Sequence, residues 1–180
     1  MEISKTLYVK TRSEWRKWLE KNHDKAPGIW LVYYKKASGK PRIPYNEAVQ
    51  EALCYGWIDS ILKGIDDERL AQRYSPRQPK SNWSALNLER MKMLIKGKQM
   101  TPAGLKYYPG ATEFKIPKDI LKEIKKDKET WNNFQKFDES YQIIRIGFIE
   151  GARSRPEEFQ KRLKYFLKKT KENKKFGMEA

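Results

Sequence analysis

The sequence predicts an α+β fold, in which a small, mostly antiparallel sheet flanked by helices is followed by a helical region. Residues 29–36 begin with six aromatic or aliphatic side chains, as in a buried strand. Two further strand-like runs surround a turn within residues 57–74, and from residue 116 apolar residues recur at helical spacing. We therefore expect an α+β core domain over residues 1–110 and a helical C-terminal region over residues 111–180. One continuous domain, whose last helices cover the sheet, is the alternative.

The first part of the chain predicts a strand, a helix and a second strand. Residues 3–10 alternate loosely, and Thr11 with Glu14 forms a capping-box pattern at the start of the helix. We expect that helix to end near His23, which has a capping role, and to turn three residues into the core: Trp15, Trp18 and Leu19. Both faces of the strand at residues 29–36 are apolar, so we expect it to be central and covered on both sides.

The central stretch predicts a helix followed by a hairpin. Residues 46–55 have apolar positions at helical spacing, and Gly56 suits a left-handed cap. A strand from Trp57, a turn at residues 64–68 and a return strand at residues 70–74 follow. The next helices are expected to begin at small polar caps: Ser81, Asn82 or Ser84 for one, and Thr101 for the other.

The C-terminal region predicts a series of helices that begins at Pro117. Asp138 or Ser140 is expected to cap one of them, and Ser154 with Glu157 forms a capping-box pattern for the last. The helix after residue 138 is expected to turn its apolar positions inward: Tyr141, Ile144, Phe148, Ile149 and Ala152. Residues from 173 onward are expected to be frayed.

The chain is strongly basic, with 39 Lys and Arg residues against 23 Asp and Glu residues and a net charge of +16. Residues 161–175 hold eight basic residues and one acidic residue. Such a balance favours a polyanion, such as nucleic acid, anionic lipid or an acidic protein, while plain solubility is the alternative. The candidate polyanion-binding residues are Lys161, Arg162, Lys164, Lys168, Lys169 and Lys171.

Polar residues around the predicted hairpin form a candidate pocket for a small anionic ligand. Asp59 shares a strand face with Trp57, and Arg73 and Arg77, which the hairpin brings back, are its expected partners. Two arginines beside a carboxylate could hold an anion bidentately, whereas a structural ion pair with helix capping is the alternative. The candidate ligand-binding residues are Trp57, Asp59, Arg73, Ser75, Arg77, Ser81, Trp83, Ser84 and Asn87.

Several classes of site lack support in this sequence. A single cysteine, Cys54, excludes an internal disulfide, and a single histidine excludes a multi-histidine metal centre. We expect Cys54 to be a small buried hydrophobe. No metal, no cofactor and no catalytic motif is indicated, which favours a non-catalytic protein over an enzyme. No apolar run reaches the length of a membrane span, and the N-terminus has no signal-peptide core, so we expect a cytoplasmic protein.

Several motifs together resemble one known family. They are SEWRKWLEKNH, IWLVYYKK, EALCYGWIDS, YSPR, SNWSALN, KGKQMTPAG and the helical IPKDILKEIKKDKETWNNF, which together span nearly the whole chain. They resemble the YdeI/OmpD-associated family, also described as bacteriocin-protection proteins. The resemblance implies a role in bacteriocin or antimicrobial stress tolerance without a defined mechanism. Nucleic-acid binding through the basic surface and action on a small anionic ligand at the Asp59 and Arg77 cluster are the two alternatives.

Overall fold

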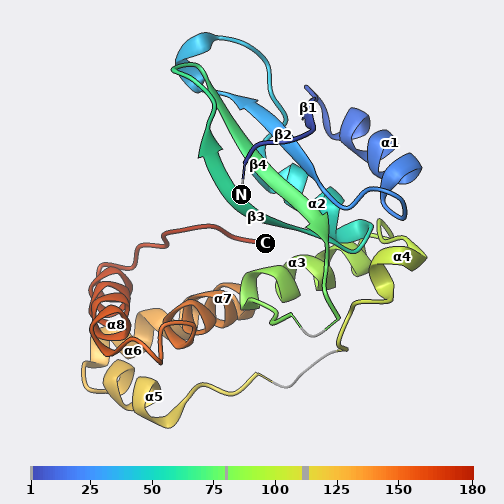
Figure 1. Cartoon of the computed structure of the whole chain (residues 1–180). Helices are drawn as coiled ribbons and strands as arrows, with labels where there is room; N and C mark the ends of the chain where they lie inside the picture. Colours follow the sequence, from blue (N-terminus) through green and yellow to red (C-terminus); the bar gives the residue numbers. More distant parts are fainter. Residues whose placement is uncertain (1, 80, 111–113) are drawn as a thin grey trace. The chain divides into compact units, whose positions relative to one another are not determined.

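The computed structural model describes residues 2–79, 81–110 and 114–180, and within these ranges it has an α+β fold. A four-stranded, mostly antiparallel sheet and the helices α1 to α8 make up the regular structure (Figure 1). The predicted fold class is therefore confirmed. The chain divides into two compact units, one formed by Met1–Ser81 with Leu94–Pro109 and the other by Asn82–Met93 with Gly110–Ala180. These units place residues 82–93 with the helical part, whereas the predicted boundary lies at residue 110.

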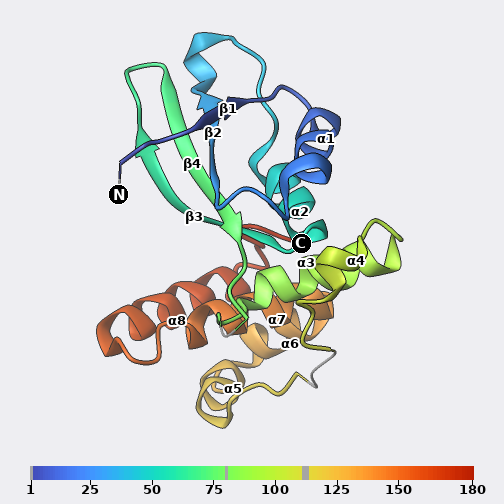
Figure 2. The same ribbon diagram turned by 45° about the vertical axis from the view of Figure 1, so that its right-hand side comes forward.

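The first unit contains the sheet, whose strand order is β1-β2-β4-β3 (Figures 1 and 2). The strands are β1 (Thr6–Tyr8), β2 (Ile29–Tyr34), β3 (Trp57–Gly64) and β4 (Arg69–Pro76). β1 pairs with β2 in parallel, and the other two pairings are antiparallel. β2 is an inner strand with buried side chains on both faces, from Ile29 to Tyr33, as its apolar run predicts.

Two helices of the first unit pack on the sheet face that carries Tyr74. They are α1 (Arg12–Asn22) and α2 (Tyr45–Cys54). The Trp15 ring of α1 meets the Tyr74 ring edge-on with centroids 5.4 Å apart, and its Nε1 donates to the backbone oxygen of Ala48 in α2 at 3.0 Å. Trp15 thus joins both helices to the sheet, which confirms its predicted place in the core.

Helix ends in the first unit follow the capping residues in the sequence. Thr11 accepts a hydrogen bond from the Glu14 backbone at the start of α1, and His23 is the C-cap of that helix. Gly56, one residue after the C-cap of α2, has a φ of 72°, a left-handed conformation that favours glycine. Thr101 caps the short α4 (Pro102–Leu105). A 3₁₀ turn (Lys36–Ser38) follows β2.

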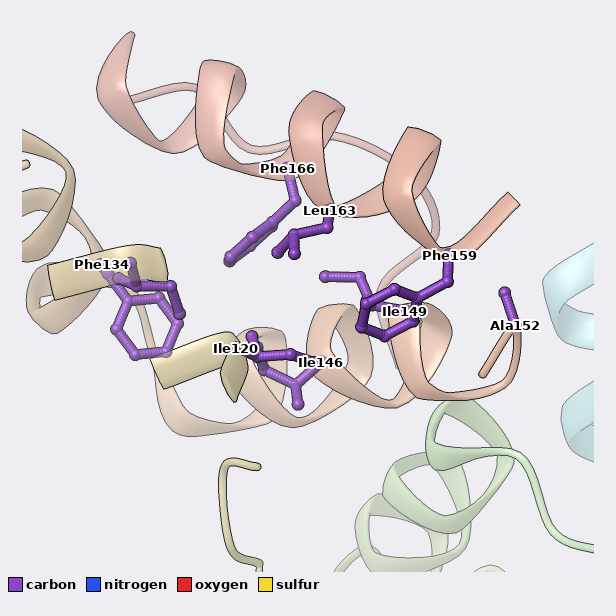
Figure 3. Close-up of a cluster of buried hydrophobic side chains, with 9 residues drawn as sticks. Ile120, Phe134, Ile146, Ile149, Ala152, Phe159, Leu163 and Phe166 are labelled. Carbon is purple, nitrogen blue, oxygen red and sulfur yellow. The ribbon is translucent and has the colours of Figure 1, made fainter. Parts of the chain in front are cut away.

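The second unit is helical. It comprises α5 (Lys118–Lys125), α6 (Lys128–Lys136), α7 (Glu139–Glu150) and α8 (Pro156–Lys171), together with the beginning of α3 (Ala85–Lys96), which runs from one unit into the other. Figure 3 shows side chains of α7 and α8 turned toward one another in its core. The buried cluster consists of Ile120, Ile124, Phe134, Ile146, Ile149, Ala152, Phe159, Leu163 and Phe166.

Two predictions about α7 and α8 are wrong. Phe148 is not inward but 48% exposed, and the guanidinium of Arg162 lies over its ring at 3.9 Å from the centroid. Ser154 does not cap α8, because the N-cap is Arg155, with no side-chain cap hydrogen bond, and Pro156 occupies the first turn. Proline has no backbone N–H and its φ already suits a helix start, so the helix can begin there without a capping box.

The C-terminal tail (residues 174–178) is packed rather than frayed, which corrects a further prediction. Lys175 pairs with Asp138, which also caps α7. The Phe176 backbone N–H donates to the Tyr141 hydroxyl at 3.2 Å, and the Phe176 ring meets Tyr165 edge-on. These contacts hold the tail against α7 and α8 within the second unit.

Candidate functional site

The predicted pocket residues fall in both compact units. Trp57, Asp59, Arg73, Ser75, Arg77 and Ser81 belong to the first unit, and Trp83, Ser84 and Asn87 belong to the second. Their convergence into one pocket therefore stays a prediction, and each group is described within its own unit.

Asp59 and Arg73 do not face each other. The β3–β4 register places Asp59 opposite Tyr74, so the side chain of the preceding residue, Arg73, lies on the other face of the sheet. Asp59 Oδ2 accepts a 2.6 Å hydrogen bond from the Tyr45 hydroxyl, whereas Arg73 Nη1 donates to Ser75 Oγ at 3.3 Å. The expected pairing of Asp59 with Arg73 is thus replaced by a tyrosine contact from α2.

Arg77 and Trp57 both donate hydrogen bonds to backbone oxygens. Arg77 is only 4% exposed; its backbone N–H donates to the Gly56 oxygen at 2.8 Å and its Nη2 to the Ser81 oxygen at 3.2 Å. Burial lowers the pKa of its guanidinium. Trp57 Nε1 donates to the backbone oxygen of His23 at 2.9 Å. Both side chains therefore bridge segments of the fold, which favours the structural alternative for this part of the cluster.

Ser84 and Asn87 act at the start of α3. Ser84 Oγ accepts from the Asn87 backbone N–H at 3.2 Å, and Asn87 Oδ1 accepts from Arg90 Nη1 at 2.9 Å. Trp83, the residue before the cap, is half-buried. The capping role anticipated for Ser84 is present.

Two buried tyrosines lie on the same sheet face as Asp59, and sequence reasoning did not single them out. The hydroxyls of Tyr33 and Tyr74 are 3.0 Å apart. Burial raises both pKa values, that of Tyr33 to about 12, and the nearby carboxylate of Asp59 raises them further. The sequence contains one indication of a buried Tyr33: alternation along β2 places it on the same face as Ile29 and Leu31.

The predicted basic surface of α8 separates into paired and unpaired residues. Arg162 pairs with Glu158 at 2.7 Å, Lys169 with Glu172 at 2.9 Å, and Lys171 with Asp127 at 3.0 Å. The other three candidates form no ion pair among the described residues, and all three are exposed: Lys161, Lys164 and Lys168. Their spacing places them on one side of the helix. We call these three the lysine row.

The second unit also contains a cavity that the sequence did not predict. Its volume is about 460 Å³, and the walls come from the first turn of α3, from α7 and from the C-terminal tail. Arg145 of α7 is only 6% exposed and lines it together with apolar side chains: Leu86, Ile144, Phe148, Phe176 and Met178. Burial lowers the pKa of Arg145. We call this space the Arg145 cavity.

The described residues form neither a metal-binding cluster nor a membrane-spanning helix. Within the described ranges, no group of three or more His, Cys, Asp or Glu side chains is placed to hold a metal ion. No helix among those residues is both long and apolar enough to cross a bilayer. Cys54 is buried, and burial raises the pKa of its thiol to about 11.

Fold and sites define a basic α+β protein whose helical unit carries an exposed lysine row and a cavity with a buried arginine. Residues 7–107, more than half of the chain, match the family model described as "Domain of unknown function (DUF8412)", and the chain belongs to that family. Residues 113–173 match a second family model, "Bacteriocin-protection, YdeI or OmpD-Associated". The resemblance to the YdeI/OmpD-associated family is confirmed for residues 113–173 in the helical region, whereas six of the seven motifs that suggested it lie in the part of the chain matched by the first model. No curated protein and no solved structure matches the chain.

Proposed function

We propose that the protein is a non-catalytic binding protein that contributes to bacteriocin or antimicrobial stress tolerance. The observation that carries the proposal is the match of residues 113–173 to the bacteriocin-protection model, which spans α5 to α8. This region has its own buried core, so it can present surface side chains on a fixed framework. We also propose that the protein acts in the cytoplasm, which cell fractionation with a specific antibody would test.

The charge of the chain bears on the kind of partner. A net charge of +16 repels cationic peptides and attracts anionic molecules over distances of about one Debye length. Direct capture of a cationic peptide is therefore disfavoured. Tolerance through an anionic partner inside the cell fits the charge better, and the lysine row is one exposed group of lysines that form no ion pair among the described residues.

Deletion and complementation in the host would test this proposal. Loss of the gene should lower the concentrations of bacteriocins and cationic peptides that inhibit growth, and the wild-type gene should restore them. A variant with the lysine row replaced, Lys161→Gln with Lys164→Gln and Lys168→Gln, should fail to restore tolerance although it folds normally. A deletion strain with unchanged tolerance would refute the proposal.

Nucleic-acid binding is the second candidate, and the lysine row is the observation that favours it. Unpaired lysines release counterions when they bind phosphates, so binding must weaken with salt. Fluorescence anisotropy with single-stranded and duplex DNA, between roughly 50 and 200 mM salt, would measure this dependence. Lys164→Gln with Lys168→Gln should reduce the salt slope by about 2.

The matched control removes the same charge from paired residues. Lys169→Gln with Lys171→Gln removes one ion-pair partner each from Glu172, which keeps Lys174, and from Asp127, but does not touch the lysine row. A smaller effect of this control on DNA binding supports a specific surface. Equal effects of both double variants would mean that only the total charge matters.

A further inference from the structure

Arg145 is a buried cation that forms no ion pair among the described residues; the Glu179 carboxylate acts on it from a longer distance and is paired with Lys175. Arg145 Nη2 donates to the backbone oxygen of Met178 at 2.6 Å, and Arg145 Nε has no acceptor in the described part of the chain. No carboxylate within the described ranges forms an ion pair with it. Buried charges are normally paired, because desolvation of an ion is costly. The guanidinium carries five N–H donors, and the one acceptor that it meets among the described residues is neutral. Its remaining donors therefore point to a missing anion.

Aromatic rings and the tail backbone also lie close to the guanidinium. The centre of the guanidinium lies 5.5 Å from the Tyr141 ring centroid, 5.9 Å from that of Phe148 and 5.3 Å from that of Phe176. A Cβ on Gly177 would lie 2.0 Å from Arg145 Nη1, so the tail backbone lies directly against it. Cation–π contacts stabilise such a charge in part but do not use its hydrogen-bond donors.

The Arg145 cavity has the size and lining of a small-ligand site. Its volume of about 460 Å³ is within the range of such pockets, roughly 300 to 1,000 Å³. Arg145 is the one ionisable residue among its lining residues. The first turn of α3, at Ala85 and Leu86, belongs to the same wall, and the N-terminal end of a helix favours a negative charge.

We propose that the Arg145 cavity binds an amphipathic monocarboxylate, with the carboxylate on the Arg145 guanidinium and the apolar body against Leu86, Ile144 and Phe148. One guanidinium balances one negative charge, which fits a carboxylate better than a doubly charged phosphate. The apolar walls fit a hydrocarbon chain better than a sugar or a nucleotide, whose hydroxyls would be left without partners. This site is separate from the lysine row and does not depend on the role in tolerance.

Decanoate is a suitable probe, with decanol as the same chain without the charge. Isothermal titration of the full chain, below the critical micelle concentration, should show saturable binding of decanoate. Decanol should bind at least about tenfold more weakly, because it lacks the charge-assisted hydrogen bonds. The Arg145 Nε–H resonance in a ¹⁵N-resolved spectrum should shift with decanoate and not with decanol.

Two substitutions separate the site from general charge. Arg145→Met should weaken decanoate binding at least about tenfold, whereas Arg155→Met, the same change at an exposed arginine, should leave it unaltered. If Arg145→Met does not fold, the resonance shift in the wild-type chain decides the question. Equal binding of decanoate and decanol, unchanged binding in Arg145→Met, or no binding at all would overturn the proposal.

Discussion

The buried Tyr33 hydroxyl should make the fold sensitive to alkali in a defined pH range. Its pKa is raised from 10.0 to about 12, first by burial. Because each pKa unit corresponds to about 1.36 kcal/mol, the full difference amounts to roughly 2.7 kcal/mol. The folded state holds the proton more tightly than the unfolded state. This contribution is therefore fully present below pH 10 and is lost as the pH rises toward 12.

Tyr33→Phe removes the titrating group and leaves the ring in place. Near pH 9 the variant should lose about 0.5–1.5 kcal/mol of unfolding free energy, because the hydrogen bond to Tyr74 is gone. Between pH 9 and pH 11.5 the wild type should lose roughly 2 kcal/mol more than the variant does. Urea unfolding followed by far-ultraviolet circular dichroism at both pH values measures the two differences.

Tyr165→Phe is the matched control, since Tyr165 is 49% exposed. Its stability should fall with pH in parallel with the wild type. If Tyr33→Phe also falls in parallel with the wild type, the Tyr33 hydroxyl ionises as freely in the folded chain as in the unfolded chain. The burial argument for this sheet face would then be refuted.

Three further changes test other parts of the structure. Glu51 is 2% exposed, and its carboxylate accepts hydrogen bonds from Arg12 at 2.5 Å and Arg16 at 2.9 Å. Glu51→Gln should lower the free energy of urea unfolding by roughly 2 kcal/mol, less than the loss of a fully buried pair, because both arginines are partly exposed. An equal loss in the exposed Glu20→Gln would contradict this. Hydrogen bonds from Thr130 and then Lys171 lower the pKa of Asp127 to about 2. The ionised Asp127 should therefore stabilise the fold above about pH 4, and this stabilisation should disappear as the pH falls through 2. A carboxyl ¹³C titration of Asp127 with an ordinary midpoint would disprove this prediction. A Cβ on Gly147 would lie 2.3 Å from the Ala85 Cβ, so Gly147→Ala should destabilise by about 1–3 kcal/mol and Ala85→Gly should rescue it, whereas absence of rescue would place the strain elsewhere.

Local signals account for the elements that were predicted correctly. Side-chain caps at Thr11, Ser84 and Thr101 act within three residues, so the sequence shows both donor and acceptor at once. The predicted cap at Ser154 failed although its pattern was equally good. Pro156 allows the helix to begin two residues later. Which of the two helix starts is used depends on how α8 packs.

The predicted partner of Asp59 failed for a different reason. Alternation along β3 correctly places Asp59 on the face of Trp57, but the partner's face depends on the register with β4. That register contains an irregularity between Asp59 and Leu62. A shift of one residue would exchange Tyr74 for Arg73, and nothing in the local sequence distinguishes the two alignments.

Arg145 could have been recognised from its spacing. It lies four residues after Tyr141 and four before Ile149, both buried, so helical periodicity places it on the inward face of α7. In a chain with 39 basic residues an arginine is easily assigned to the surface. The position of an arginine on the apolar face of a helix is more informative than the number of arginines in the chain. A buried arginine that forms no ion pair lowers the stability of the fold. A monocarboxylate in the Arg145 cavity would offset that loss of stability, so decanoate should also raise the melting temperature of the wild type more than that of Arg145→Met.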